Sequence, residues 1–197
     1  MDLLLAICQA IGLALAVGVG GPIAALFITA MAGLHAGIDA RGTSWDFLGK
    51  IWFLVLVAIS SLVALSLARR EDGPRRLARL GFATVFGAIA GAASLAEKGE
   101  PAILGLVIGA LVGAGSGIVA TDVLIGARRR AELSNLEEPQ SAANTLEGIF
   151  AVTGIVIALL ALFLPPLSLL GIVALVVLAN GRRRKADEKY EGLRVLR

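Results

Sequence analysis

Long apolar runs, separated by short polar or charged stretches, fill most of this chain. Two of the junctions carry no charge and consist of glycine or proline instead: Gly20-Gly21-Pro22 near the start and Pro165-Pro166 near the end. In a helix, a run of about 17 residues reaches about 26 Å, slightly short of the roughly 30 Å core of a bilayer. Seven runs follow this pattern: Leu3–Val19, Pro22–Gly37, Phe47–Ala68, Leu80–Ala96, Pro101–Ala127, Leu146–Leu164 and Leu167–Ala179.

The runs predict helices rather than strands. Lipid offers no partners to free backbone groups, so a membrane span is either a helix or part of a closed barrel. These runs are nearly continuous instead of alternating, which excludes a barrel. We therefore expect an all-α, polytopic transmembrane bundle of about seven apolar helices, in which the two Gly/Pro breaks create helical hairpins. Full crossings and re-entrant hairpins would place the termini alike, and the length of the runs favours full crossings.

The composition agrees with a membrane protein and excludes an ordinary soluble domain. Of the 197 residues, 57% are hydrophobic, and the mean hydropathy is +0.86. We expect one transmembrane domain over residues 1–181, followed by a basic cytoplasmic tail over residues 182–197, with the lipid bilayer as the main partner.

The arginines and lysines gather in blocks at 69–79, 128–130 and 182–185, which hold five, three and four of them. In a soluble protein such blocks would suggest nucleic acid, but no aromatic side chains are interleaved with them, so we expect no nucleic-acid partner. The positive-inside rule places all three blocks in the cytoplasm. The prediction is a multi-pass protein of the bacterial cytoplasmic (inner) membrane, with its N-terminus outside and its C-terminus cytoplasmic.

A glycine stripe is the strongest local pattern, because a helix face without side chains lets a neighbouring backbone approach closely. We expect the fourth run to pack on this stripe within the chain, and the alternatives are a homo-oligomer seam or a pore-lining helix. The stripe consists of Gly105, Gly109, Gly113 and Gly117. In addition, the spacing of Gly12, Gly20 and Pro22 recurs in Gly91, Gly99 and Pro101, which leaves open an inverted repeat of two three-run units.

Four polar side chains at or near membrane depth are candidates for a pathway or binding site: Gln9, Thr29, Asp122 and Glu147. An ionised group inside a bilayer usually faces a cavity or a partner. Asp122 has two interpretations, because Arg128 follows it closely. It is either solvated or paired at the cytoplasmic interface, or it is a proton or cation site. For Glu147, which follows Asn144, the alternative is a capping role at the start of the sixth run.

Motifs for catalysis or for cofactor binding are missing from the sequence. There is no GxSxG, HExxH or P-loop pattern, and His35 comes without a second histidine, a CxxC or a carboxylate cluster. Cys8 is the single cysteine, so it forms no intrachain disulfide. We expect no metal and no cofactor, and an enzyme is the less favoured class.

The order of these features resembles the domain of unknown function 4126 family of small bacterial membrane proteins. The resemblance implies a polytopic inner-membrane protein and supplies no activity. It rests on Gly12-Leu13-Ala14-Leu15-Ala16 with Gly18 and Pro22 after it, and on Asn144 and Glu147 leading into Leu159-Leu160-Ala161-Leu162-Phe163-Leu164-Pro165 and a basic end.

Three functional hypotheses follow from the sequence. The first is a small transporter or channel for an unidentified solute or ion, because interrupted helices build the midplane sites of many transporters. The second is a non-catalytic scaffold or packing subunit that associates through the glycine stripe, and the third is a lipid-handling membrane protein. A hydrated cavity at the breaks would favour the first, dry and tightly packed breaks the second, and a polar cluster at headgroup level the third.

Overall fold

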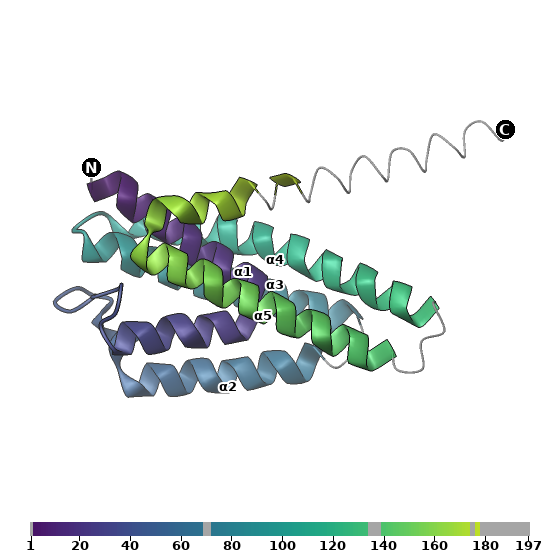
Figure 1. Cartoon of the computed structure of the whole chain (residues 1–197). Coiled ribbons are helices and arrows are strands. Elements are labelled where there is room, and N and C mark those ends of the chain that lie inside the picture. Colours follow the sequence, from purple (N-terminus) through teal and green to yellow (C-terminus); the bar gives the residue numbers. More distant parts are fainter. Residues whose placement is uncertain (1, 69–71, 134–138, 174–175, 178–197) are drawn as a thin grey trace.

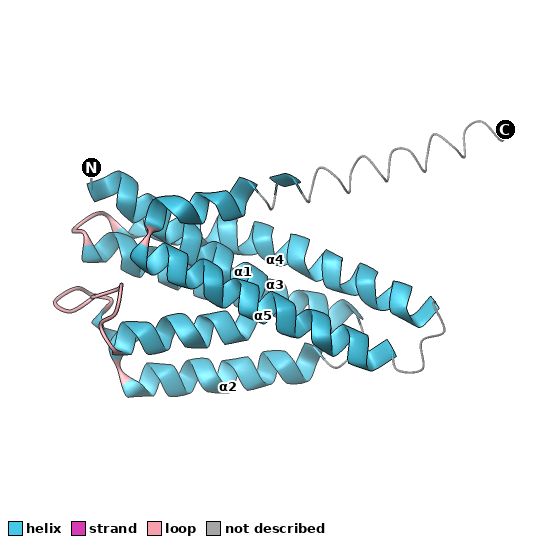
Figure 2. Ribbon diagram, viewed as in Figure 1, coloured by secondary structure: helices cyan, strands magenta, loops and turns pink. Residues whose placement is uncertain are grey.

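Five long helices run side by side in the computed structural model, which describes residues 2–68, 72–133, 139–173 and 176–177 (Figure 1). Over these residues the regular structure is helical, and no strand is present (Figure 2). The elements are α1 (Asp2–Gly33), the short 3-10 helix η1 (Asp46–Gly49), α2 (Ile51–Ala68), α3 (Asp72–Glu97), α4 (Ala102–Leu133) and α5 (Pro139–Phe163). Residues 165–173 are helical as well. The predicted basic tail, 182–197, lies outside the described residues.

Four of the helices are long and apolar enough to cross a membrane, and α2 is a shorter apolar helix. The all-helical class and the multi-pass membrane architecture therefore agree with the structure. The predicted count of seven helices is not confirmed, because the first two runs join into the single element α1, and the inverted repeat is not confirmed either. The membrane-capable stretches are Leu3–Gly33, Arg76–Glu97, Ala102–Arg130 and Asn144–Phe163.

Both predicted breaks coincide with reversals of the chain. Gly21 has φ 61° and ψ −140°, a conformation that only glycine adopts readily, so α1 is interrupted there. Pro22 then begins the second half of the helix, where its missing N–H costs nothing. Figure 1 shows this second half returning toward the end of the bundle at which the chain starts. Likewise, α5 ends at Phe163, Leu164 is not helical, and the helical residues 165–173 double back beside α5 (Figure 1).

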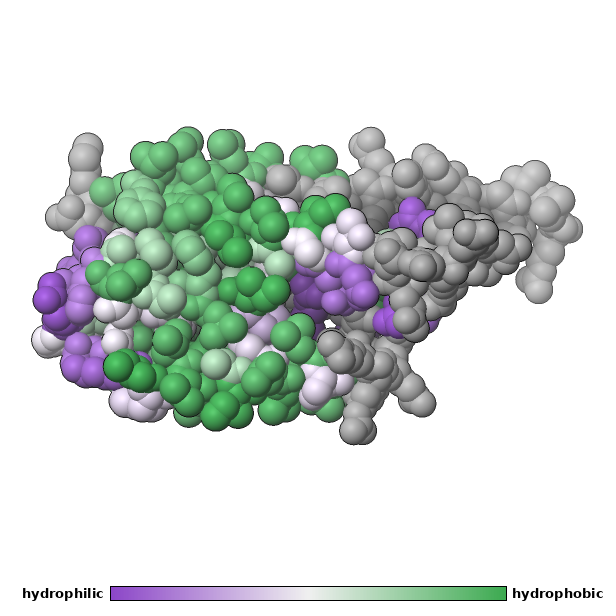
Figure 3. All heavy atoms as spheres, turned by 60° about the horizontal axis from the view of Figure 1, so that its bottom comes forward, coloured by the Kyte–Doolittle hydropathy of each residue, from purple (hydrophilic) through white to green (hydrophobic). Residues whose placement is uncertain are grey.

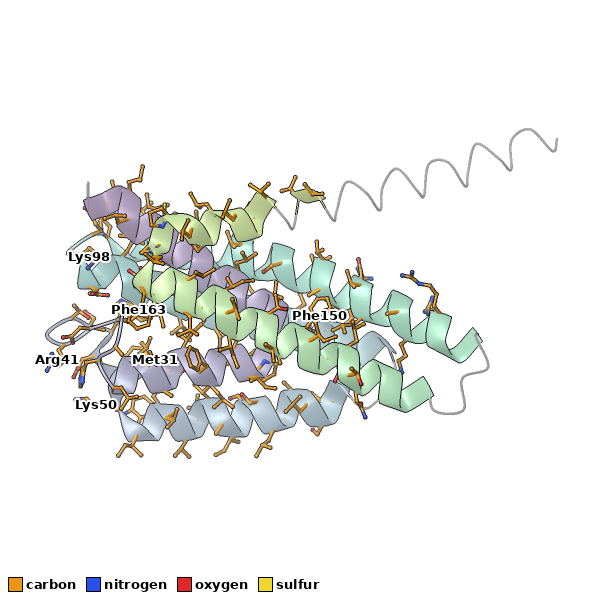
Figure 4. The ribbon with its side chains drawn as sticks, in the orientation of Figure 1. Met31, Arg41, Lys50, Lys98, Phe150 and Phe163 are labelled. Atoms are coloured by element: carbon orange, nitrogen blue, oxygen red, sulfur yellow. The ribbon has the colours of Figure 1, made fainter. Side chains whose placement is uncertain are left out.

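The bundle has two chemically different ends. The loop end holds residues 34–50 and 98–101, and Figure 4 shows Arg41, Lys50 and Lys98 gathered there. Arg41 pairs with Asp39, and the hydrogen bond from its guanidinium lowers the pKa of that carboxyl to about 2. We call the opposite end, where α3 begins and α4 ends, the basic end. Figure 3 shows the apolar side chains as a band between polar patches at the two ends.

The glycine stripe packs inside the chain, against α3. A Cβ added at Gly87 would lie 2.7 Å from the carbonyl oxygen of Gly109 and 3.2 Å from the Cα of Gly113. One at Gly105 would collide with the backbone of Gly91. Two helices whose facing positions lack side chains gain many backbone contacts, which compensates for the missing hydrophobic force between helices in lipid. Because α3 occupies this face, a second copy of the chain could reach the stripe only by displacing α3.

The arrangement of the two ends predicts the outcome of cysteine labelling in cells. With Cys8 replaced by alanine, single cysteines at the exposed positions Ser44 and Lys98 should react with a membrane-impermeant maleimide added outside. A cysteine at the exposed Gly73 should react only after permeabilisation, because α2 and α3 meet at the basic end, which the positive-inside rule assigns to the cytoplasm. Labelling of positions 44 and 73 from the same side would contradict this arrangement.

Candidate functional site

Two of the four polar candidates have structural roles. Gln9 is buried, and its Nε2 donates a hydrogen bond to the carbonyl oxygen of Gly37 at 2.7 Å, which ties the first half of α1 to the loop that follows its second half. The hydroxyl of Thr29 donates to the carbonyl oxygen of Ala25 at 2.9 Å, four residues back in the same helix. Both groups thus bond to backbone carbonyls, Gln9 to one 28 residues away and Thr29 to one in its own helix, and Thr29 also lines a small cavity with Val17 and Phe86.

Asp122 lies at the basic end of α4, beside α3. Its carboxylate is 3.4 Å from the guanidinium of Arg76, and the two side chains are 42% and 54% exposed. An ion pair this exposed contributes about 0–1 kcal/mol of stability. Of its two interpretations, the structure therefore favours the paired interfacial carboxylate over a cation site within the bundle.

Glu147 is the candidate that lies beside a cavity at a helix break. The cavity has a volume of about 120 Å³ and sits where α1 is interrupted, between α2 and α5. A cavity needs about 10–15 Å³ to hold a single water, so several waters or one small polar group fit into this one. The lining residues are Gly20, Pro22 and Ile23 of α1, Ala64 and Leu65 of α2, Arg79 of α3, and Glu147, Gly148 and Ala151 of α5.

Arg79 supplies the positive charge of this cavity and holds the break of α1 in place. Its guanidinium donates a hydrogen bond to the carbonyl oxygen of Val19 at 2.8 Å. The carbonyls of the last helical turn have no partners within their own helix, and together they carry a partial negative charge. The guanidinium of Arg79 therefore has two effects at this helix end: it gives the carbonyl oxygen of Val19 a hydrogen-bond donor, and it offsets the partial negative charge. Gly21 lies against the same guanidinium, and its conformation reverses the chain directly after Val19.

Arg79 was not among the predicted site residues, because the block of arginines at 69–79 was interpreted only as a cytoplasmic signal before the apolar run that begins at Leu80. The signal that could have revealed it is the spacing of four residues along α3. Arg79 continues the line of Ala83, Gly87 and Gly91, which is the face that packs into the bundle. An arginine on the buried line of a membrane helix needs a polar partner, and here that partner is the broken end of α1.

The chain after the second break, at Pro165-Pro166, packs on the first half of α1 through Ser168. The hydroxyl of Ser168 is buried and lies within hydrogen-bond distance of the carbonyl oxygens of Pro165, at 2.6 Å, and Cys8, at 3.1 Å. A Cβ at Gly12 would collide with the side chain of Ser168. The two breaks thus differ: a buried hydroxyl packs beside the turn at Pro165, whereas the break at Pro22 borders a cavity with charged walls.

The site offers electrostatic binding rather than bond-making chemistry. It brings one carboxylate and one guanidinium to a small space beside backbone groups freed by a helix break, and this is the arrangement by which interrupted helices hold charged solutes. Within the described ranges, no group of histidine, cysteine and acidic residues is arranged to hold a metal ion.

In comparisons with known proteins, no family model, no curated protein and no solved structure matches this chain.

Proposed function

We propose that this protein is a small multi-pass membrane transporter or channel, and that the cavity at the break of α1 is its site for a small charged solute or ion. The observation behind this proposal is the placement of Glu147 and Arg79, two side chains of opposite charge from different helices, around the point where α1 is interrupted. Both side chains lie in helical stretches apolar enough to cross a membrane, where charged groups are costly and usually serve a function. Their position at a discontinuous helix matches the way transporters build substrate sites.

The scaffold hypothesis has less support. It relied on the glycine stripe as an association surface and on dry, packed breaks. The stripe faces α3 of the same chain, and the break at Pro22 borders a cavity. We further propose a bacterial inner-membrane location with the N-terminus outside, from the arginine blocks, and membership of the domain of unknown function 4126 family, from the resemblance described above.

The decisive test compares Glu147→Gln with Asp122→Asn in proteoliposomes. Both changes neutralise a carboxylate at the same end of the bundle, but only Glu147 lines the cavity. Using fluxes of protons, sodium, potassium and chloride as probes, we expect wild-type flux of at least one of them to exceed that of empty liposomes. Glu147→Gln should then lower this flux by about tenfold or more, as expected when a charged contact worth about 1.4 kcal/mol or more is lost.

Asp122→Asn should keep most of the wild-type flux, because its carboxylate pairs with Arg76 outside the cavity. Two results would contradict the proposal: wild-type flux no greater than that of empty liposomes for every probe, or equal flux in Glu147→Gln and the wild type.

A further inference from the structure

The cavity at the break of α1 is open sideways. Its walls come from α2 on one side and α5 on the other, and α2 packs on α1, α3 and η1, whereas α5 packs on α1 and α4. Several lining residues also reach the molecular surface: Ile23 is 43% exposed, Leu65 is 40% exposed, and Gly148 is exposed. A molecule could therefore enter between α2 and α5 from the surrounding bilayer.

The rim of this opening is apolar toward the middle of the bundle. Leu62 and Val152 lie one helical turn from the lining residues Leu65 and Gly148, on the side of the loop end, and they are 67% and 61% exposed. Toward the basic end, three residues before the lining residue Arg79, lies the exposed Arg76, which pairs with Asp122 of α4. The opening thus lies where an apolar surface meets a charged one, which is the level of lipid headgroups.

The charges in the cavity select the ligand. Arg79 attracts an oxyanion, and the second half of α1 begins at Pro22 beside the cavity, where the positive end of a helix dipole adds to this attraction. Glu147 attracts an ammonium group. An ion of a single sign is attracted by only one of the two side chains, whereas a molecule that carries both charges a few bonds apart is attracted by both.

We propose that the cavity binds a zwitterion that combines a phosphate or carboxylate with a primary ammonium, and that its source is the headgroup of an aminophospholipid such as phosphatidylethanolamine. The phosphate lies toward Arg79 and the start of the second half of α1, the ammonium toward Glu147, and the acyl chains along the exposed apolar residues of α2 and α5. The proposal rests on the cavity being the functional site proposed above, and it names the ligand of that site.

Native mass spectrometry of the full chain in detergent tests this proposal. Phosphatidylethanolamine and phosphatidylglycerol with identical acyl chains are added in equal amounts; both carry a phosphate, but only the first carries an ammonium. We expect the wild type to retain phosphatidylethanolamine about tenfold more, because one charge-assisted hydrogen bond to Glu147 distinguishes the two lipids. Equal retention of the two lipids by the wild type would overturn the proposal, whatever the variants do.

Glu147→Gln should remove the preference while phosphatidylglycerol still binds, and Asp122→Asn should leave the preference intact. A merely structural role of Glu147 would lower the binding of both lipids without changing their ratio, and an unchanged ratio in folded Glu147→Gln would also overturn the proposal.

Free phosphoethanolamine distinguishes the two sources of this chemistry. If it competes with the lipid at millimolar concentration, the cavity takes soluble zwitterions as well. If only the lipid binds, the headgroup enters from the bilayer, and both results support a site for zwitterions. The outcome is independent of the ion fluxes above: a Glu147-dependent flux without a lipid preference would overturn this inference alone, and a lipid preference without any flux would overturn transport alone.

Discussion

Replacing Gly109 by leucine is expected to destabilise the protein more than the substitutions at Gly21, Asp122 or Glu147. The stripe brings the backbones of α3 and α4 together, and a Cβ at Gly109 would collide with the carbonyl of Gly87 and lie 3.0 Å from the Cα of Ala88. Backbone atoms cannot swing aside as side chains do, so the helices must separate. The decrease in the free energy of unfolding should exceed about 1–3 kcal/mol, the value typical of overpacking in a core. The reason is that all contacts between α3 and α4 along the stripe weaken together.

The matched control for this exchange is Gly115→Leu in the same helix. A Cβ at Gly115 meets no atom within 4 Å. Both variants gain the same helix propensity, so the difference between their melting temperatures in detergent isolates the packing at the seam. Equal melting temperatures would show that α3 and α4 do not depend on close backbone contact.

Replacing Gly21 by alanine should both destabilise the protein and abolish the function of the cavity. The obstacle is conformational rather than steric, because a Cβ there would meet only the guanidinium of Arg79, at 3.8 Å. An L-residue at φ 61° and ψ −140° costs about 1–3 kcal/mol. The chain should relieve this cost by moving the break, which displaces Val19 from Arg79 and reshapes the cavity.

Gly148→Ala is the control for this second exchange. Gly148 lines the same cavity, is helical, and has no atom within 4 Å of an added Cβ. We expect the melting temperature of Gly148→Ala in detergent and its Glu147-dependent flux to remain close to those of the wild type. Gly21→Ala should melt at a lower temperature and lose the flux. If Gly21→Ala behaved like Gly148→Ala, the conformation of Gly21 would not determine the site.

Local patterns predicted the features of this fold that depend on a few neighbouring residues. The stripe of Gly105, Gly109 and Gly113 follows from spacing alone, since glycines four apart share a helix face. The break at Gly21 follows from the low helix propensity of glycine and the missing N–H of proline. In both cases the sequence itself contains the cause, so one chain sufficed to locate the feature.

The charged residues were harder to place, because their roles depend on the packing of distant helices. α3 begins at Asp72, whereas the apolar run begins at Leu80, so several arginines of the basic block at 69–79 belong to a helix. Arg76 then reaches Asp122, and Arg79, three residues on, reaches Val19. The sequence left open whether Asp122 is solvated, paired with an arginine or an ion site, and the structure places it beside Arg76 of another helix. Which residues pair across two helices depends on the register between those helices, and composition and hydropathy do not specify that register.

The central position of α1 has a consequence for biosynthesis. This helix packs against α3, α4 and α5, and 72% of its most apolar stretch is buried inside the bundle. It leaves the ribosome before α2, α3 and α4, whereas α5 and the helical residues 165–173, which cover Gly12 and Gly20, follow after them. Until then the small-residue face of α1 is exposed to lipid, and the nascent chain cannot reach its final packing span by span. Assembly must therefore be completed after translation has passed α5, when the last hairpin docks onto the first.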